Sequence, residues 1–406
     1  MKRVVVTGMG CITALGQDWE QARIRLQQGK NTIRYMPEWE RYEGLFTRLG
    51  GPVDFEKPVH YTRKATRTMG RVALMSVRAT ELALEAAGLK DDLLLASGRV
   101  GIAYGSSAGS TSATADFSNM LLNGSTQGLN ATTYIRMMSH TTAVNIAVYF
   151  GVKGRVYTTS SACTSSSQGI GYGYEAIRHG SQTVMLCGGA EELCPTEAAV
   201  FDTLFATSTK NDTPELTPRP FDKDRDGLVV GEGACTLVLE ELEHAQARGA
   251  TIYAEIVGYG TNCDGVHVTQ PCVDSICRVL QLSLDDAGIA ASDVDYISAH
   301  GTATDRGDIA ESHAVLNVLG DQIPLSALKS YTGHTLGACG STEAWATILM
   351  MQDGWFHPTL NLHNLDPECA SIDYITGDGR SLACEIAMSN NFAFGGINTS
   401  LIFKRI

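Results

Sequence analysis

A cysteine and two histidines have the clearest potential for chemistry in this sequence of 406 residues. Cys163 lies where a β-rich run ends in small residues and a helical segment begins. His300 ends a predicted strand next to Gly301, and His334 lies in a glycine-rich turn before another predicted helix. A cysteine assisted by histidines is typical of covalent acyl transfer, so these three residues predict acyl chemistry through a thioester.

The surroundings of Cys163 favour a reactive thiol. A helix is predicted from about Cys163 to His179, which places the thiol near the positive end of a helix dipole. We expect this position to lower the pKa of the thiol below its usual value of about 8.5. The serines and glycines around Cys163 leave room for an acyl chain.

A weak internal repeat indicates which elements position these residues. Each half of the chain alternates predicted strands and helices, which favours layered α/β sheets built by duplication. We therefore predict two halves, residues 1–250 with Cys163 and residues 251–406 with both histidines. The repeated segments are Val4–Gly10 with Ala254–Gly260, Glu81–Leu89 with Leu282–Ile289, Arg99–Ser106 with Val294–Gly301, and Thr183–Gly189 with Glu385–Asn391.

Composition excludes several classes of protein. With 44 acidic and 31 basic residues the net charge is −13, which disfavours binding to nucleic acid. No apolar stretch approaches the roughly 18 residues that a membrane helix needs. The hydrophobic run after the first basic residues is only three valines, which is too short for a signal peptide, so we expect a cytoplasmic protein. The 11 cysteines are scattered without a C-x-x-C pair and the 10 histidines lack metal-ligand spacing, so neither a disulfide framework nor a metal is predicted.

Five ordered motifs resemble one family along the whole chain, the elongating β-ketoacyl-acyl carrier protein synthases, which are condensing enzymes of the thiolase fold. This resemblance implies an α/β thiolase fold with duplicated βαβαβ halves in layers ordered αβαβα. The motifs are Thr159–Ser165, Pro220–Gly227, His300–Thr304, Lys329–His334 and Asn391–Asn398.

The resemblance implies a decarboxylative Claisen condensation that needs no cofactor. Cys163 would take an acyl group from a carrier protein or coenzyme A, and malonyl-acyl carrier protein would lose carbon dioxide to give the attacking enolate. Neutral His300 and His334 would donate hydrogen bonds to the malonyl thioester oxygen. The backbone N–H groups of Cys163 and Phe394 would form a second oxyanion hole, and Phe392 belongs to the same gate region.

Four further residues are expected to support the site. Lys329 and Glu343 match family positions and would form a buried ion pair. Asp308 and Glu311 lie at i and i+3 on a predicted helix, where they would hold the His300 loop; a solvated helix face is the alternative for this acidic pair.

Docking and pocket residues are predicted with departures from the family pattern. Lys57–Thr80 holds six basic residues and no acid, so Arg63, Lys64, Arg67 and Arg71 could dock an acidic acyl carrier protein. Phe205 stands where some relatives carry another docking arginine. Ala108 replaces a bulky isoleucine and would lengthen the acyl tunnel, and Ala393 replaces a glycine beside Phe394. These departures favour a specialised synthase, such as one for a polyene or another type II polyketide.

Two alternative functions are each disfavoured by one feature of the sequence. A degradative thiolase needs a second cysteine in a C-terminal loop, where this chain reads Asn391–Gly396. A non-catalytic chain-length partner would lack the nucleophile. The family implies a dimer, either of two copies or with a paralogous subunit.

Two apparent motifs are rejected. Asp222–Gly227 opens like a calcium loop, but its twelfth position is Gly233 instead of glutamate. Gly8-Met-Gly10 leads to Thr13 where a dinucleotide fingerprint requires glycine.

Overall fold

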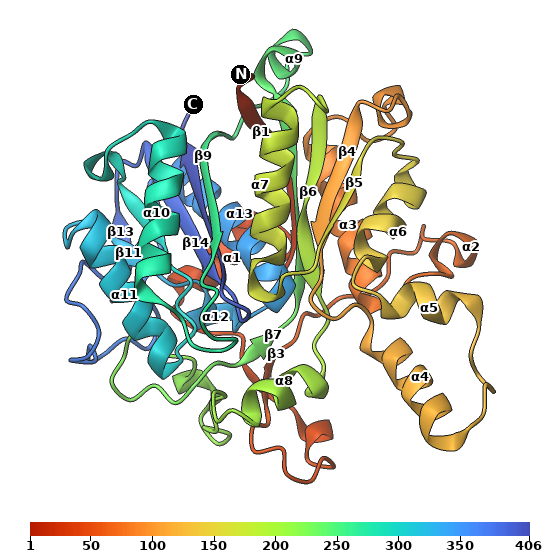
Figure 1. The fold of residues 1–406 in the computed structure, drawn as a ribbon, viewed down its shortest axis with the longest axis horizontal. Helices are drawn as coiled ribbons and strands as arrows, with labels where there is room; N and C mark the ends of the chain where they lie inside the picture. Colours follow the sequence, from red (N-terminus) through yellow and green to blue (C-terminus); the bar gives the residue numbers. More distant parts are fainter.

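The computed structural model describes all 406 residues and places one ten-stranded sheet through the centre of the molecule (Figure 1). Its spatial order is β11-β10-β14-β15-β9-β1-β8-β6-β4-β5. The strands of this sheet are β1 (Val4–Ile12), β4 (Val100–Gly105), β5 (Val156–Thr159), β6 (Val184–Glu191), β8 (Gly233–Glu241), β9 (Ala254–Cys263), β10 (Tyr296–Ser298), β11 (Leu325–Ser326), β14 (Ile386–Phe392) and β15 (Ile397–Lys404).

The two halves of the sheet have the same topology. Taken in chain order, the strands of each half lie in space as first, fifth, fourth, second and third. The fourth, second and third strands run parallel in both halves, and the fifth is antiparallel to its two neighbours. Antiparallel pairing of Val4–Val6 with Ala254–Ile256 joins the halves. This topology confirms the duplicated α/β fold.

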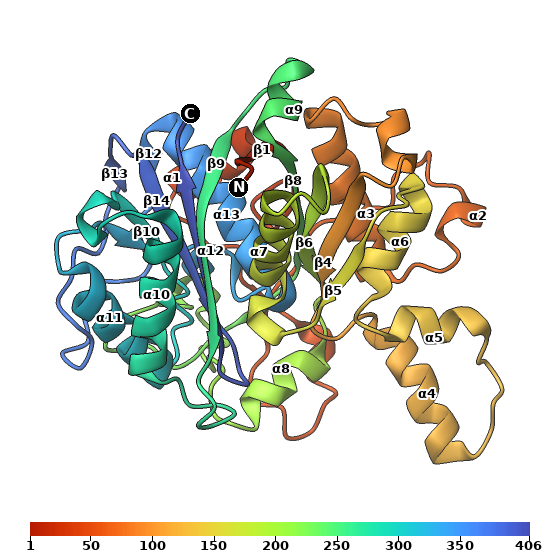
Figure 2. The same ribbon diagram turned by 45° about the horizontal axis from the view of Figure 1, so that its top comes forward.

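Helices complete the layers (Figures 1 and 2). Helices α7 (Ser165–Arg178) and α13 (Cys339–Asp353) pack together between the two halves. Outside them, α3 (Arg71–Ala86) and α6 (Thr141–Phe150) cover the first half, and α10 (Val273–Ala287) and α11 (Asp305–Leu319) cover the second. The division at residue 250 stays a prediction, because the one sheet crosses it.

The remaining elements are short or peripheral. The small strands are β2 (Arg34–Tyr35), β3 (Leu49–Gly51), β7 (Val230–Gly231), β12 (Trp355–Phe356) and β13 (Arg380–Ser381). The other α-helices are α1 (Trp19–Gln27), α2 (Arg63–Thr66), α4 (Thr111–Asn123), α5 (Ala131–Met137), α8 (Pro195–Asp202), α9 (Leu242–Ala247) and α12 (Lys329–Thr332). The 3₁₀ turns are η1 (Pro37–Trp39), η2 (Leu93–Ala96), η3 (Ala162–Thr164), η4 (Pro214–Leu216), η5 (Ala291–Asp293) and η6 (Leu336–Ala338).

Glycines explain how the outer helices approach the sheet so closely. A Cβ atom on Gly8 or Gly10 would lie 2.3 or 2.2 Å from a carbonyl oxygen of α3. A Cβ atom on Gly258 or Gly260 would lie 2.4 Å from a carbonyl oxygen of α10. The Gly-x-Gly pairs of the sequence repeat therefore serve helix packing in both halves, which is incompatible with a phosphate-binding role.

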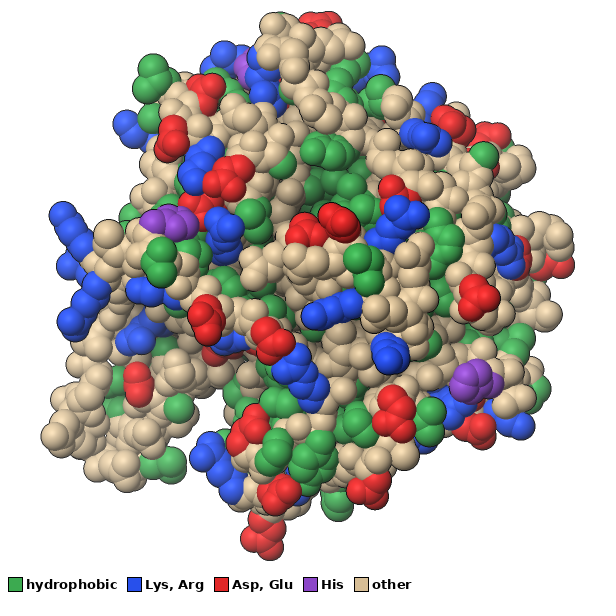
Figure 3. Space-filling model, turned by 180° about the vertical axis from the view of Figure 1, so that it is seen from behind, with side chains coloured by type: hydrophobic (Ala, Val, Ile, Leu, Met, Phe, Trp, Pro, Cys, Tyr) green, Lys and Arg blue, Asp and Glu red, His purple; other side chains and the backbone are tan.

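An arm formed by α4 and α5, residues 111–137, projects from the body (Figure 2). It contains only one acidic residue, Asp116, and one basic residue, Arg136, and seen from behind it is mostly tan and green (Figure 3). Leu121, Leu122 and Tyr134 on this arm are exposed. None of the helices is both long enough and apolar enough to span a bilayer.

Candidate active site

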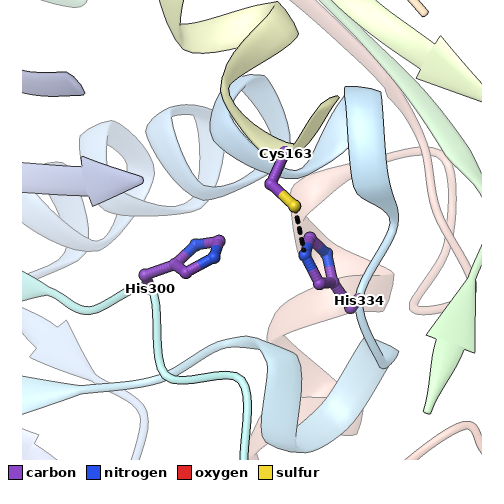
Figure 4. Close-up of side chains that lie close together, drawn as sticks. All are labelled: Cys163, His300 and His334. Atoms are coloured by element: carbon purple, nitrogen blue, oxygen red, sulfur yellow. Dashed lines mark hydrogen bonds between the residues drawn. The ribbon is translucent and has the colours of Figure 1, made fainter. Parts of the chain in front are cut away.

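Cys163, His300 and His334 meet at one buried point between the two halves (Figure 4). One sulfur or ring nitrogen from each lies within 4.8 Å of the others. Nε2 of His334 lies 3.0 Å from Sγ of Cys163, and the two imidazole rings are 5.3 Å apart, edge to face. The three residues selected in the sequence therefore form one cluster.

The local fold around Cys163 fixes the position of its sulfur. Cys163 lies in η3, between the end of β5 and the start of α7, as the sequence predicted. Ala162 has a φ of 51°, a left-handed conformation that is costly for alanine. The Ser165 hydroxyl holds this turn, because it accepts from the Ser161 N–H at 3.0 Å and donates to the Ala162 carbonyl at 2.7 Å.

Hydrogen bonds define the tautomer of His334. Its Nδ1 accepts a hydrogen bond from the Leu336 N–H at 3.1 Å, so in the neutral ring the proton lies on Nε2. The Nε2–H group therefore donates toward Cys163 Sγ. In this state His334 is a hydrogen-bond donor and offers no lone pair for removing the thiol proton.

His300 has the same tautomer for a different reason. Its Nδ1 lies 3.1 Å from Nζ of Lys329 and 3.4 Å from Nδ2 of Asn391, both of which are donors. Nδ1 is thus the acceptor, and the proton again lies on Nε2. Both histidines consequently carry an Nε2–H donor.

Burial keeps both imidazoles neutral. It lowers the pKa of His300 and of His334 well below the ordinary value of 6.5, and the positive charge of Lys329 lowers both further. Neutral Nε2–H groups in a dry site are suited to stabilising negative charge that develops on a substrate oxygen.

The expectation of a lowered thiol pKa at Cys163 is wrong. Burial raises the pKa of Cys163 to about 11. Lys329 and the backbone N–H groups of Phe394 and of Cys163 itself act in the opposite direction but do not compensate. Removal of water outweighs the nearby positive charge and the helix N-terminus, so the resting residue is a thiol.

Lys329, Glu343 and Asn391 form a buried network behind His300. Nζ of Lys329 is paired with Oε1 of Glu343, and Oε2 of Glu343 accepts from Nδ2 of Asn391 at 2.6 Å. The predicted Lys329–Glu343 ion pair is therefore present. Asn391 received no role in the sequence analysis, although it begins the quoted Asn391–Asn398 motif.

Cys339 also lies in this region without having been predicted. It is the first residue of α13, and its thiol donates to the Cys163 carbonyl at 3.1 Å. Its sequence neighbours are glycine and alanine, as around many structural cysteines, so only the adjacent His334 motif could have indicated its position.

Glu311 and Asp308 hold the loop that carries His300. The Glu311 carboxylate accepts from the backbone N–H groups of His300 and Gly301, both at 2.7 Å. Asp308 accepts from the N–H groups of Ala303 at 3.1 Å and Phe221 at 2.7 Å. Both carboxylates are buried, which is incompatible with the alternative of a solvated helix face.

A cavity of about 500 Å³ opens onto the cluster. Phe392 lies edge-on to His300 with ring centroids 5.9 Å apart, and Phe394 packs against Phe201 at 5.3 Å. Both phenylalanines line the cavity, whereas Ala108 does not. The backbone N–H of Ala108 instead donates to the buried carboxylate of Glu191 at 3.2 Å. The pocket role expected of Ala108 is thus not provided by this cavity.

In the basic segment Lys57–Thr80, some basic side chains are exposed without an acidic partner and others are paired within the protein. Arg63, Lys64 and Arg67 are exposed and lie on or next to α2. Arg71 instead makes a bidentate ion pair with Glu232, at 2.9 and 2.7 Å, and donates to backbone carbonyls of Val53 and Phe55. Arg71 is thus engaged within the protein although its side chain is 39% exposed, and the expectation that it docks a carrier protein stays a prediction.

The cluster also contains more potential metal ligands than the dispersed histidines suggested. Cys163, His300 and His334 form one group of three, and His300, Cys339 and Glu343 form another. The ammonium of Lys329, 3.1 Å from His300, opposes a resident cation at this point. The absence of a metal stays a prediction.

Known proteins are similar to this chain in sequence and fold along its whole length. Residues 1–245 match the family described as beta-ketoacyl synthase, N-terminal domain, and residues 253–363 match beta-ketoacyl synthase, C-terminal domain. A 3-oxoacyl-(acyl-carrier-protein) synthase 2 of Synechocystis sp. is 38% identical over 411 residues, which cover 100% of this chain and 98% of that protein.

Two solved structures are similar over their full lengths. A beta-ketoacyl synthase from Burkholderia phymatum STM815 has a TM-score of 0.99 and 57% identity, covering 100% of both chains. A structure described as the ishigamide ketosynthase/chain length factor has a TM-score of 0.90 and 34% identity, covering 100% of this chain and 99% of that one.

Proposed function

Because this chain belongs to the β-ketoacyl synthase family and is an acyltransferase of the condensing type, we propose that Cys163 holds the growing acyl chain as a thioester. Malonyl-acyl carrier protein then extends this chain by two carbons with loss of carbon dioxide. The observation that carries the proposal is the pair of neutral imidazoles, each with Nδ1 occupied and Nε2–H available beside the thiol.

In the first step Cys163 takes the acyl group. Sγ bonds to the acyl carbon, the carbon–sulfur bond to the carrier breaks, and the thiol proton leaves with the carrier thiol. The backbone N–H groups of Cys163 and Phe394, which already favour negative charge on Sγ, stabilise the oxyanion of the tetrahedral intermediate.

In the second step the two histidines stabilise an enolate. The carbon–carboxylate bond of the malonyl group breaks, and its electron pair forms the enolate as carbon dioxide leaves. The Nε2–H groups of His300 and His334 donate to the thioester oxygen where this charge develops. The enolate carbon attacks the acyl-enzyme and releases Cys163 as a thiolate, which then takes a proton.

The carrier protein is proposed to dock at α2. Arg63, Lys64 and Arg67 are exposed and free of acidic partners, and they suit the acidic surface that a carrier protein would present. Phe205, which is 85% exposed and lines the cavity mouth, would add an apolar contact where some relatives carry arginine.

A dimer is proposed through the edge of the sheet at β5. This strand has a neighbour on one side only, and Val156 at its start is exposed. The nearly uncharged arm of α4 and α5 lies toward the same end of the molecule (Figure 1). Since one structural neighbour is a ketosynthase with its chain length factor, the partner is either a second copy or a paralogous subunit.

The remaining proposals concern pathway and location. We propose elongation in fatty-acid or type II polyketide synthesis, in the cytoplasm. A purely non-catalytic chain-length role is disfavoured by the intact cluster of Cys163, His300 and His334. A degradative thiolase is disfavoured because asparagine and phenylalanine occupy the loop where a second active cysteine would stand.

Mass spectrometry of the products tests the proposed reaction. The protein is incubated with malonyl-acyl carrier protein and with saturated and unsaturated acyl primers, and Cys163→Ala is the control. We expect a primer-dependent gain of one two-carbon ketide unit that is lost in the variant. Absence of product from every primer, also with a co-purifying paralogue added, would contradict the proposal.

A further inference from the structure

Helix α8 connects the active-site cavity to a second group of buried acids. Phe201, near its end, lines the cavity that contains Cys163. Glu197 lies four residues earlier and therefore on the same face of the helix, one turn away. This carboxyl group has no role in the reaction proposed above.

Glu197 is the exception among four neighbouring acids. Glu191 accepts from the N–H groups of Ser107, Ala108 and Gly337. The other two neighbours are also satisfied: Glu192 accepts from the Val72 and Thr111 amides, and Glu232 is paired with Arg71. Glu197 is only 7% exposed, yet neither of its carboxyl oxygens has a hydrogen-bond partner.

The chemistry of this group follows from its surroundings. Burial raises the pKa of Glu197 well above its ordinary value, and the nearby Glu191, Cys194, Glu192 and Glu232 raise it further. A buried carboxyl group with no hydrogen-bond or cationic partner favours its neutral form, which has one O–H donor and one carbonyl acceptor. A buried polar group of this kind requires a partner, because leaving both hydrogen bonds unmade is costly.

The position of Glu197 relates it to the acyl chain. On one side is Phe201, which packs against Phe394 and forms a wall of the cavity. Glu191, whose carboxylate holds the Ser107–Ala108 backbone, is near enough to raise the pKa of Glu197. Phe201 lines the cavity and Glu197 does not, so an acyl chain extending from Cys163 would have to pass Phe201 for its distal part to reach this carboxyl.

We propose that Glu197 is a specificity-determining residue that recognises a hydroxyl group on the distal part of the acyl chain bound to Cys163. A hydroxyl matches a neutral carboxyl group, since each provides one donor and one acceptor. An ammonium group would instead require an ionised carboxylate. The inference rests on the proposed function, because it assumes that Cys163 is acylated.

Acylation of Cys163 by competing primers tests this inference. Matched thioesters of several chain lengths are offered in equal amounts, one of each pair ending in a hydroxyl and the other in a methyl or phenyl group. Intact mass spectrometry of the protein measures which acyl group is on Cys163, without the need for condensation. The variants are Glu197→Leu and the conservative Glu197→Gln, with Val200→Ala on the exposed side of α8 as matched control.

We expect the wild type and Val200→Ala to prefer the hydroxylated primer by about tenfold or more at one or more chain lengths. Glu197→Leu should abolish this preference, because no polar group is left in need of a partner. Glu197→Gln should retain part of it, since an amide also donates and accepts. A merely structural role of Glu197 would lower acylation by both primers equally.

Two outcomes overturn the inference in different ways. Equal acylation by both members of every pair, or a preference that survives in Glu197→Leu, would leave the synthase intact and remove the role of Glu197. If no primer acylates Cys163 of the wild type, the proposed function itself fails and this inference fails with it.

Discussion

The two halves of this protein have the same topology but contribute differently to the site. Strand pairing shows which positions of the two halves correspond. In the first half Gly10 pairs with Thr236, which pairs with Gly188. In the second half Gly260 pairs with Ser400, which pairs with Asn390. The residues that follow are Gly189 in the first half and Asn391 in the second. Asn391 therefore occupies a position that is glycine in the other half.

The same comparison holds for the reactive residues. Gly105, which pairs with Gly189, corresponds to His300, which lies next to Asn391. The turns before the central helices also correspond, since η3 begins at Ala162 with φ 51° and η6 begins at Leu336 with φ 45°. The second residue of η3 is Cys163, and the second residue of η6 is Gly337.

Cys163, His300 and Asn391 thus each correspond to a glycine in the other half, and the glycines permit close packing. A Cβ atom on Gly189 would lie 2.2 Å from the Gly337 carbonyl oxygen, and one on Gly105 would lie 2.0 Å from the Thr159 carbonyl oxygen. Room for a side chain exists in one half only at each position. The duplication therefore yields one composite site instead of two weak ones.

An inserted segment adds the remaining groups of the second half. Two residues lie between Thr159, at the end of β5, and Ala162, whereas nine lie between Ser326, at the end of β11, and Leu336. This longer connection contains α12, and it supplies Lys329 and His334. The asymmetry in length gives the second half the Lys329 ammonium and the His334 imidazole.

Removing the nucleophile is the strongest test of this division of labour. Cys163→Ala should lower primer-dependent condensation at least about 10³-fold, since a covalent mechanism loses its intermediate. Intact mass spectrometry should find no acyl group on the variant. Cys339→Ala, at the first residue of α13, should still become acylated. An acyl group found on Cys339 of the wild type would contradict the assignment.

Removing a donor from the second half should have the next largest effect. His334→Ala and His300→Ala should each lower malonyl decarboxylation about 10²–10³-fold, because each loses one Nε2–H group beside the developing enolate. Carbon dioxide release from malonyl-acyl carrier protein measures this step alone. Equal loss of Cys163 acylation and of decarboxylation would instead indicate general damage to the site.

The ionisation of the reactive groups should also depend on pH differently in the two halves. Because the pKa of Cys163 is about 11, its thiolate fraction should rise about tenfold per pH unit between about pH 6 and about pH 9. The histidines, whose pKa values are well below 6.5, should remain neutral throughout. The rate of alkylation of Cys163 by iodoacetamide measures the thiol. A plateau near neutral pH would mean that the thiol pKa is low.

The smallest effect is expected at the surface of the first half. Changing Arg63, Lys64 and Arg67 together to glutamate should raise the KM for acyl carrier protein substrates about tenfold, through loss of electrostatic attraction. The kcat should change little. Acylation of Cys163 by acyl-coenzyme A, a step that involves no carrier protein, provides the control. Equal effects with both donors would exclude a docking role for α2.

Sequence reasoning succeeded where the signal is local or repeated. The Gly-x-Gly pairs and apolar helix patterns predicted the duplicated fold, and the turns around Cys163, His300 and His334 identified residues that the structure brings together. It failed where the answer depends on distant groups. The helix N-terminus at Cys163 is visible in the sequence, but the burial that raises its pKa is produced by elements far along the chain.

Arg71 and Glu197 both show that a sequence does not reveal which charged groups are paired. Arg71 has a partner that is distant in sequence, and Glu197 has none. Arg71 belongs to a basic run that reads as one solvent-facing surface, yet Glu232, distant in sequence, pairs with it. Glu197 carries no motif, and only the arrangement of the neighbouring acids reveals that it alone lacks a partner. The charged residues of a sequence can be counted, but the fold decides which ion-pair or hydrogen-bond partner each of them has.

The tautomers of the two histidines have a consequence for how protons enter and leave the cycle. Nδ1 of His334 is occupied by the Leu336 amide and Nδ1 of His300 faces the Lys329 ammonium, so neither ring can store a proton between steps. The thiol proton leaves with the carrier thiol, and the thiolate freed by condensation takes its replacement from solvent. Each turnover thus draws one proton from the surrounding water, and a thiol with a pKa of about 11 is well suited to capture it.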